Sequence, residues 1–226
     1  MKGMLGRRRP NANGKANMSK YVVYDLEMCR VPRGEKRDAF GSRQELIQIG
    51  AVLLDEEYEI IDSFVTFVKP RFGELDDFIV KLTGITQPDL VDAPSTEEAL
   101  ESFLNWMPED AVMVSWSESD TYQLYHEIDG KGIDSPRLED LLEVAIDCQY
   151  EFEEKLNSNR TYGLAEALSI TGIDCDERVH DALSDARNTA LLFKKIMTEP
   201  VLKMSKYYLS EEDMSSYMYG KRSGLR

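Results

Sequence analysis

The chain has 226 residues, of which 42% are hydrophobic, which suits one ordinary globular domain with a buried core. No apolar run approaches the roughly 18 residues that a membrane span needs, and the first residues lack the apolar stretch of a secretory signal. The three cysteines form no C-x-x-C pair, so they indicate neither a disulfide framework nor a zinc cage. We therefore expect a cytoplasmic protein without membrane contact.

The charge of the chain is uneven along its length. The formal net charge is −15, but the first 20 residues hold six basic residues and no acid, so 21 basic and 42 acidic residues remain for the rest. A net charge of −21 repels a polyanion. A nucleic-acid partner would then be bound through local basic groups, backbone donors and metal ions, as short or single-stranded pieces. Plain solubility explains the same charge equally well.

Three segments differ in composition. Residues 1–19 are rich in Gly, Asn and Arg without periodicity, which predicts a disordered basic arm, either a solvated tail or a segment that holds RNA through its arginines. Residues 20–199 carry regular hydrophobic patterns and form the predicted domain. Residues 200–226 are predicted to be a C-terminal extension that packs on the domain, covers the site or pairs subunits.

Five segments read as strands. The runs YVVY from Tyr21, LIQIGAVLLD (46–55) and EIIDSFVTFVKP (59–70) are rich in β-branched and aromatic residues. A short polar turn joins the second run to the third, so we expect the first three strands to form an antiparallel meander. AVMVSW (111–116) predicts a buried fourth strand, and a fifth is predicted within IDCQYEF (146–152).

Helical periodicity fills most of the remaining chain. We predict helices over 96–107, from about 119 to 128, and over 138–145, 161–172 and 182–197. The predicted fold is α/β: a mixed five-stranded sheet flanked by helices, with the first and fourth strands central because they are the most uniformly apolar.

The first strand contains two acids. In VYDLEMCR, Asp25 and Glu27 lie two residues apart in an otherwise apolar run, so both project from one face. Buried like charges require either a shared proton or a cation between them. A divalent metal ion satisfies that requirement.

Three further groups stand at positions where they could join this pair. Asp120 follows the fourth strand, Asp185 begins the last long helix, and His180 precedes it by five residues. Five residues turn about 140° around a helix, so these two converge only if His180 lies in the entering loop. Taken singly, each acid is equally well a helix-start carboxylate and the histidine a surface or core residue. Oxygen ligands suit Mg²⁺ or Mn²⁺, and two such ions about 3.5–4 Å apart can bridge a scissile phosphate.

The order D-x-E, a lone Asp, then H-x-x-x-x-D resembles the signature of the DEDDh 3′-to-5′ exonucleases, which have the ribonuclease H-like fold. LTGIT (82–86), GLAEAL (163–168) and HDALSDARNTALLF (180–193) are similar to the branch that trims small RNAs and histone-mRNA ends, with its sporulation-inhibitor relatives. The likeness covers about residues 21–197, and the ordered set is far more specific than D-x-E alone.

The resemblance implies roles for five residues. Asp25, Glu27 and Asp185 would hold the metal ion that carries the attacking water, Asp25 would bridge to a second ion, and Asp120 would support it. His180 would accept the proton of the water. The product would be a nucleoside 5′-monophosphate.

The resemblance also implies substrate contacts. Glu27 would receive the terminal 3′-hydroxyl, Met28 would flank the terminal base, and Leu82 is a further candidate for substrate binding. The sequence departs from the family pattern here, because Met28 and Cys29 follow D-x-E where a small residue and Thr are usual. The alternative is that these two side chains fill the core beneath the site.

Other residues of interest receive ordinary interpretations. Trp116, Tyr122 and Tyr125 could stack on bases, but their spacing is more typical of core positions. His126 lies among acids on a helix and is predicted to have no catalytic role.

We therefore expect a two-metal 3′-to-5′ exonuclease that uses Mg²⁺ or Mn²⁺ and acts on 3′ ends of nucleic acid, RNA favoured over DNA. The alternatives are a DNA exonuclease of the proofreading or repair type and a catalytically silent nucleic-acid-binding protein of the same fold. No motif identifies a contact to a 2′-hydroxyl, the group that distinguishes RNA from DNA. The sequence does not predict the oligomeric state.

Overall fold

The computed structural model describes residues 20–174, 180–202 and 205. The predicted arm over 1–19 lies outside these residues. Of the predicted extension over 200–226, only 200–202 and 205 are described.

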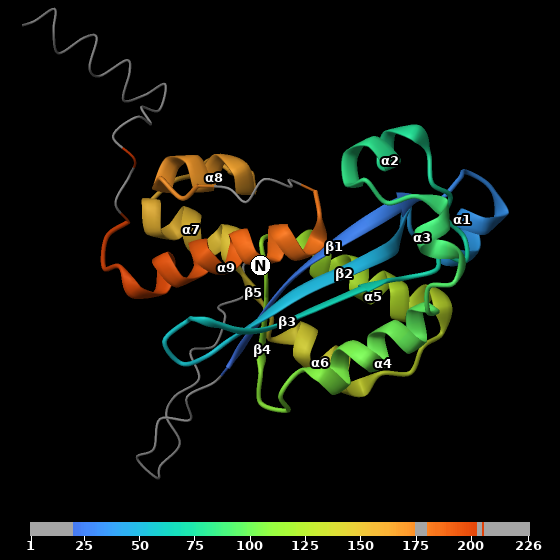
Figure 1. The fold of residues 1–226 in the computed structure, drawn as a ribbon, viewed down its shortest axis with the longest axis horizontal. Coiled ribbons are helices and arrows are strands. Elements are labelled where there is room, and N and C mark those ends of the chain that lie inside the picture. Colours follow the sequence, from blue (N-terminus) through green and yellow to red (C-terminus); the bar gives the residue numbers. More distant parts are fainter. Residues whose placement is uncertain (1–19, 175–179, 203–204, 206–226) are drawn as a thin grey trace, which may run out of the picture.

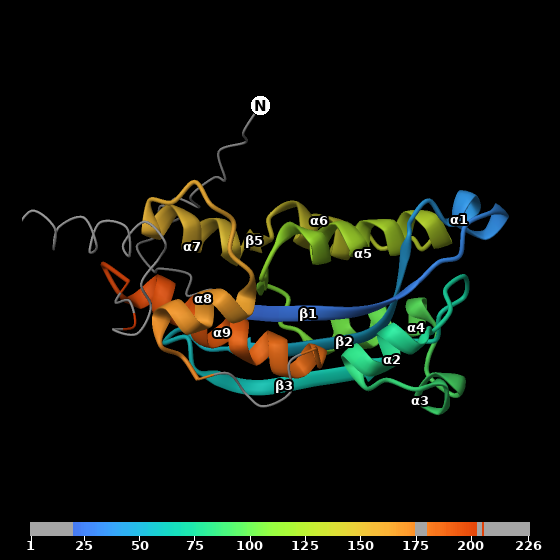
Figure 2. The same ribbon diagram turned by 90° about the horizontal axis from the view of Figure 1, so that it is seen from above.

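A five-stranded sheet forms the centre of the molecule, in the order β3-β2-β1-β4-β5. Its first three strands are antiparallel neighbours, whereas β4 runs parallel to β1 and β5 runs parallel to β4. Figure 2 shows β3 and β5 at opposite edges with β1 between them. The predicted mixed sheet with an antiparallel meander is confirmed. The strands are β1 (Tyr21–Arg30), β2 (Gln44–Leu54), β3 (Ile60–Phe67), β4 (Val112–Ser115) and β5 (Ile146–Asp147).

Helices cover both faces of the sheet (Figure 1). Helices α7, α8 and α9 lie on one face, and α4, α5 and α6 lie on the other. Short helices α1 to α3 lie near the end of β1. The helices are α1 (Glu35–Phe40), α2 (Asp77–Thr83), α3 (Gln87–Val91), α4 (Thr96–Trp106), α5 (Glu118–Lys131), α6 (Pro136–Glu143), α7 (Cys148–Leu156), α8 (Leu164–Thr171) and α9 (Ala182–Thr198).

The alternation of side chains along β1 divides the core into two layers. Val22, Tyr24 and Leu26 pack in the cluster beneath α4 to α6, whereas Val23 packs in the cluster beneath α7 to α9. Odd-numbered residues of β1 therefore face α9, because successive strand residues project from opposite faces. Asp25 and Glu27 lie on that face.

The fifth strand is shorter than predicted. Only Ile146 and Asp147 of the run 146–152 form β5, and α7 begins at the next residue. The side chain of Asp147 accepts a hydrogen bond from the N–H of Tyr150 at 2.9 Å, so it acts as the N-cap that starts the helix. Helices α1 to α3 were not predicted, because segments of five to seven residues are too short to show helical periodicity.

In the described ranges 20–174 and 180–202, no helix is long and apolar enough to cross a membrane.

Candidate active site

The two acids of β1 lie at the centre of the sheet, facing α9. In the β1–β2 ladder Asp25 pairs with Gly50 and Glu27 pairs with Gln48. Asp25 is partly buried and Glu27 is only 8% exposed. A register shift follows Glu27 immediately, so a local irregularity of the ladder lies next to the acids.

Asp120 reaches the same place from the other side of β1. It is the third residue of α5 and is 6% exposed. Backbone N–H groups of Asp120 itself and of Leu26 on β1 hydrogen-bond its carboxylate. One residue further on, the hydroxyl of Thr121 lies 2.9 Å from the phenol oxygen of Tyr24. Two contacts thus tie the first turn of α5 to β1.

His180 and Asp185 come from the start of α9. His180 lies in the turn before the helix, where its backbone is left-handed with a φ of 68°. Its backbone N–H donates a hydrogen bond of 3.0 Å to Oδ2 of Asp185, and its ring is exposed. Asp181 caps the helix by accepting a bond of 3.1 Å from the N–H of Ser184. The prediction that His180 lies in the entering loop is confirmed.

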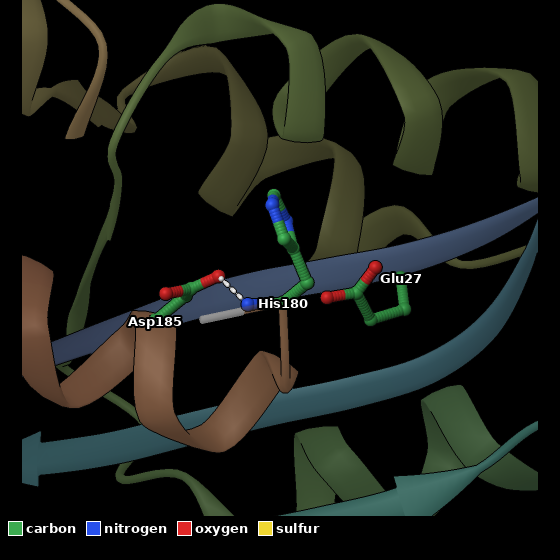
Figure 3. A group of neighbouring side chains, drawn as sticks. All are labelled: Glu27, His180 and Asp185. Carbon is green, nitrogen blue, oxygen red and sulfur yellow. Dashed lines mark hydrogen bonds between the residues drawn. The ribbon is translucent and has the colours of Figure 1, made fainter. Parts of the chain in front are cut away.

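Three of the predicted site residues form a compact cluster. One ligand atom each from Glu27, His180 and Asp185 can be chosen so that all lie within 4.8 Å of one another. Figure 3 shows these side chains on the neighbouring β1 strand and α9 turn. A group of this size can surround a single metal ion.

Two residues of β2 hold the start of α9 against the sheet. A Cβ added at Gly50 would lie 2.2 Å from the backbone carbon of Ala182 and 2.2 Å from the nitrogen of Leu183. Beside it, Oε1 of Gln48 accepts a hydrogen bond of 3.2 Å from the N–H of Ala182. Neither residue is among the site residues predicted from the sequence. A signal for them was available in the sequence, because a polar residue and a glycine interrupt an apolar strand. A glycine inside a strand often marks a place where another backbone approaches closely.

Burial and mutual repulsion raise the pKa values of the β1 acids. The pKa of Glu27 rises to about 8, mainly through burial and then through the charges of Asp185, Asp181 and Asp120. Burial also raises the pKa of Asp25 well above its ordinary value, assisted by the charges of Asp120 and Asp185. The charged forms that a metal would stabilise are therefore disfavoured in its absence.

The other two carboxyls are shifted in the same direction. Burial raises the pKa of Asp120 to about 7, although hydrogen bonds to its carboxylate oppose the shift. Burial likewise raises the pKa of Asp185, and the N–H and the charge of His180 and a hydrogen bond from Asn188 partly offset it.

The donor set fits a hard divalent cation. It offers four carboxylates and one imidazole. Among the described residues, no Lys or Arg charge is a main influence on the pKa values of these four acids. Oxygen-rich sites of this kind suit Mg²⁺ or Mn²⁺. A bound cation would supply the positive charge that neighbouring side chains do not.

The two residues after D-x-E differ in how deeply they are buried. Cys29 is fully buried and packs with Ile47, as the core interpretation predicted. Met28 is partly buried and packs against the cluster that contains Tyr24. Leu82 is partly buried in α2. The substrate contacts of Met28 and Leu82 stay predictions.

The aromatic residues near the site are not equivalent. Trp116 is 7% exposed and packs in the core, as predicted, and Tyr125 is partly buried against the core. The core prediction for Tyr122 is wrong, because this side chain is 57% exposed and lies outside the buried stripe of α5. His126 is also exposed and does not belong to the cluster of Glu27.

The fold and the site together define a ribonuclease H-like nuclease domain: a mixed sheet whose central strand presents two acids toward further acids at the starts of two helices. The model of the exonuclease family RNase_T matches residues 22–193. The chain belongs to this exonuclease family, as its ordered motifs predicted.

Curated relatives include both RNA and DNA enzymes. The chain is 32% identical over 188 residues to ERI1 exoribonuclease 2 of Danio rerio, a match that covers 72% of this chain and 33% of the relative. It is 26% identical over 191 residues to a PolC-type DNA polymerase III of Caldanaerobacter subterraneus, covering 83% of this chain and 12% of the relative. The chain thus spans about a third or less of the length of these relatives.

Solved structures share the fold. The nuclease domain of 3′hExo, described as a DEDDh family member bound to rAMP, superposes with a TM-score of 0.70 at 21% identity, over 84% of this chain and 98% of that chain. Pop2p of S. pombe, in a form that binds Mg²⁺ and Mn²⁺, gives a TM-score of 0.60 at 20% identity, over 80% and 83% of the two chains. The predicted ribonuclease H-like fold is confirmed.

Proposed function

We propose that this domain is a metal-dependent 3′-to-5′ exonuclease that hydrolyses the terminal phosphodiester of single-stranded or short RNA and releases nucleoside 5′-monophosphates. The observation that carries this proposal is that ligand atoms of Glu27 on β1 and of His180 and Asp185 at the start of α9 lie within 4.8 Å of one another. Asp25 and Asp120 extend that cluster through their electrostatic coupling to it.

Four carboxylates, Asp25, Glu27, Asp120 and Asp185, would hold two Mg²⁺ or Mn²⁺ ions. When bound, such ions stabilise the negative charge that develops at the phosphate and lower the pKa of a coordinated water. The burial of the carboxylates excludes bulk water, which strengthens their attraction for a cation. The first turns of α5 and α9 also point at the site, and helix N-termini favour anionic groups such as phosphate.

His180 would act as the general base. Its imidazole is exposed at the edge of the cluster, and its backbone is fixed by the bond to Asp185. A neutral imidazole in that position can accept the proton of the attacking water. Glu27 would receive the terminal 3′-hydroxyl, while Met28 and Leu82 would contact the terminal base, which would restrict hydrolysis to chain ends.

RNA is the substrate that we propose, with DNA as the second candidate. The relative that is 32% identical is named as an exoribonuclease, which supports RNA. The PolC-type relative is named as a DNA polymerase, which supports a proofreading-type DNA exonuclease. A binding protein that lost catalysis is less well supported, because all five predicted site residues are present.

Two further predictions belong to this proposal. Composition supports a cytoplasmic protein without membrane contact. The basic arm over 1–19 would be a solvated tail or a segment that holds RNA, and the extension over 200–226 would pack on the domain, cover the site or pair subunits.

The test is incubation of the full chain with 5′-labelled single-stranded RNA and DNA of one sequence, in Mn²⁺, Mg²⁺ or EDTA. We expect metal-dependent shortening from the 3′ end, faster on RNA. Faster shortening of DNA would select the second candidate. The absence of shortening in both substrates, with the wild type and Asp25→Asn indistinguishable, would overturn the exonuclease.

A further inference from the structure

Gln48 is a buried glutamine of β2 that lies next to the candidate site. It is 3% exposed and pairs with Glu27 in the β1–β2 ladder. Directly opposed residues of a sheet project from the same face, so Gln48 shares the face that carries the β1 acids. A buried amide costs free energy unless it is hydrogen-bonded. Gln48 therefore needs a partner on this face.

That partner is the first residue of α9. Oε1 of Gln48 accepts a hydrogen bond of 3.2 Å from the N–H of Ala182. The first N–H groups of a helix have no carbonyl partner inside the helix. The side chain of Asp181 satisfies the N–H of Ser184, and Gln48 satisfies that of Ala182. The amide of Gln48 thus joins β2 to the first turn of α9.

Ala182 lies in the chain between His180, in the turn before α9, and Asp185, in the first turn of α9. His180 precedes it by two residues, Asp185 follows it by three, and the bond from the N–H of His180 to Asp185 closes this segment into one unit. The position of Ala182 therefore determines how far both residues lie from Glu27. Gly50 permits the close approach of the helix, and Gln48 supplies a directional bond that fixes where along β2 the helix rests.

We propose that Gln48 is a positioning residue of the site, whose amide fixes the separation between Glu27 on β1 and the His180–Asp185 pair at the start of α9. This inference rests on the proposed function. The chemistry of the side chain agrees with the role: glutamine accepts a hydrogen bond while remaining neutral, whereas glutamate would add another carboxylate beside Glu27. A purely structural role would instead affect stability alone.

The test compares the wild type, Gln48→Met and Gln123→Met as full-length chains. Methionine is of similar length but offers no comparable acceptor at the amide position. Gln123 provides the matched control, because it is 5% exposed and its amide donates at 3.0 Å to the carbonyl of Gln44 and at 2.6 Å to Glu127, in a different network. The measurements are kcat and KM on single-stranded RNA with Mn²⁺, calorimetric Mn²⁺ affinity, and amide exchange of Ala182.

We expect Gln48→Met to lower kcat by about 10- to 100-fold, the effect of misplacing a reacting group by about 1 Å. KM should change by less than about threefold, because substrate contacts remain. Mn²⁺ affinity should fall and the amide of Ala182 should exchange faster. Gln123→Met should lose stability but keep kcat within about twofold of the wild type.

If Gln48→Met kept the kcat and the Mn²⁺ affinity of the wild type, the proposal would be overturned, even if the amide of Ala182 exchanged faster. An equal loss of kcat in Gln123→Met would overturn it as well, since any buried amide would then matter. If the wild type hydrolysed no nucleic acid, the proposed function would fail separately. Mn²⁺ titration would still decide the role of Gln48, because an unchanged affinity in Gln48→Met would contradict positioning of the ligands.

Discussion

Gly50 lies directly beneath Ala182, so that a methyl group at position 50 would come within 2.2 Å of the backbone of α9. No flexible side chain is available to move aside, because the close atoms belong to the helix backbone. We expect Gly50→Ala to destabilise the domain by about 1–3 kcal/mol. It should also lower activity, because α9 carries Asp185 and the turn before it carries His180. Urea unfolding and RNA hydrolysis check both effects.

Gly163 provides the matched control for this substitution. It has φ of −73° and nothing lies within 4 Å of an added Cβ. Gly163 is the N-cap of α8, where Ala is less favourable than Gly, but Ala also restricts the unfolded chain, so Gly163→Ala should change stability by less than about 1 kcal/mol. Equal behaviour of the two variants would show that the start of α9 is free to shift.

Asp25→Asn removes one charge from the centre of the site. We expect hydrolysis to fall at least about 10³-fold, since a metal ligand contributes several kcal/mol of charge stabilisation. The metal-free variant should melt no lower than the metal-free wild type, because burial and the neighbouring acids already disfavour the charged form of Asp25. Melting in EDTA and single-turnover rates measure both. A large loss of stability in EDTA would contradict the crowding argument.

The metal-free protein should lose stability as the pH rises. Unfolded carboxyls titrate near their ordinary pKa of about 4, whereas the folded pKa is about 7 for Asp120 and about 8 for Glu27. Between these values the folded state binds more protons, so the stability that these groups contribute is present at low pH and is lost through pH 7 and 8. The melting temperature in EDTA should fall by at least about 3 °C between about pH 5.5 and 8.5.

Mn²⁺ should reverse this trend, because a bound cation stabilises the ionised carboxylates. The difference between the melting temperatures with Mn²⁺ and with EDTA should therefore widen as the pH rises. A melting temperature in EDTA that rises over this range would show that the folded state does not raise the pKa values of these carboxyls.

The ordered acids made much of this site predictable from the sequence. Asp25 and Glu27 stand out because a buried strand has no packing role for paired carboxylates, and strand periodicity places them on one face. The resemblance implied that His180 and Asp185 act together, and helix geometry then required His180 to lie in the loop, because five residues of helix would have separated the two side chains. These arguments need only local spacing, which a sequence displays directly.

The contacts that hold the site together were not predictable in the same way. The bond from Ala182 to Gln48 joins residues 134 positions apart, and no local pattern encodes such a contact. Tyr122 shows a different limit of local patterns. Its spacing on α5 predicted a core position, but the side chain is exposed and does not belong to the buried face of the helix. Short helices were not predicted either, and one of them, α2, carries Leu82.

A second charged cluster lies buried where β2 meets α5. Nζ of Lys131 lies 2.6 Å from Oε1 of Glu45 and 2.6 Å from Oε2 of Glu127, and donates to the hydroxyl of Thr96 at 2.5 Å. Both glutamate side chains have no exposed surface, and that of Lys131 is 6% exposed. Glu45 also accepts hydrogen bonds from successive backbone N–H groups at residues 71–73. The cluster therefore joins β2, α5 and the segment that leads toward α2.

Lys131→Met should be among the most destabilising single substitutions of the domain. It would leave two buried carboxylates facing each other without a cation, and removing one partner of a buried ion pair costs about 3–5 kcal/mol. Lys36→Met is the control, because Lys36 lies 3.7 Å from Glu74 with both side chains more than half exposed. Such surface pairs contribute at most about 1 kcal/mol. Urea unfolding would measure the free energies of unfolding of both variants, which can be compared directly if their m-values are equal. A loss below about 1 kcal/mol in Lys131→Met would mean that water or proton uptake replaces the ammonium group, so that this cluster does not depend on the lysine charge.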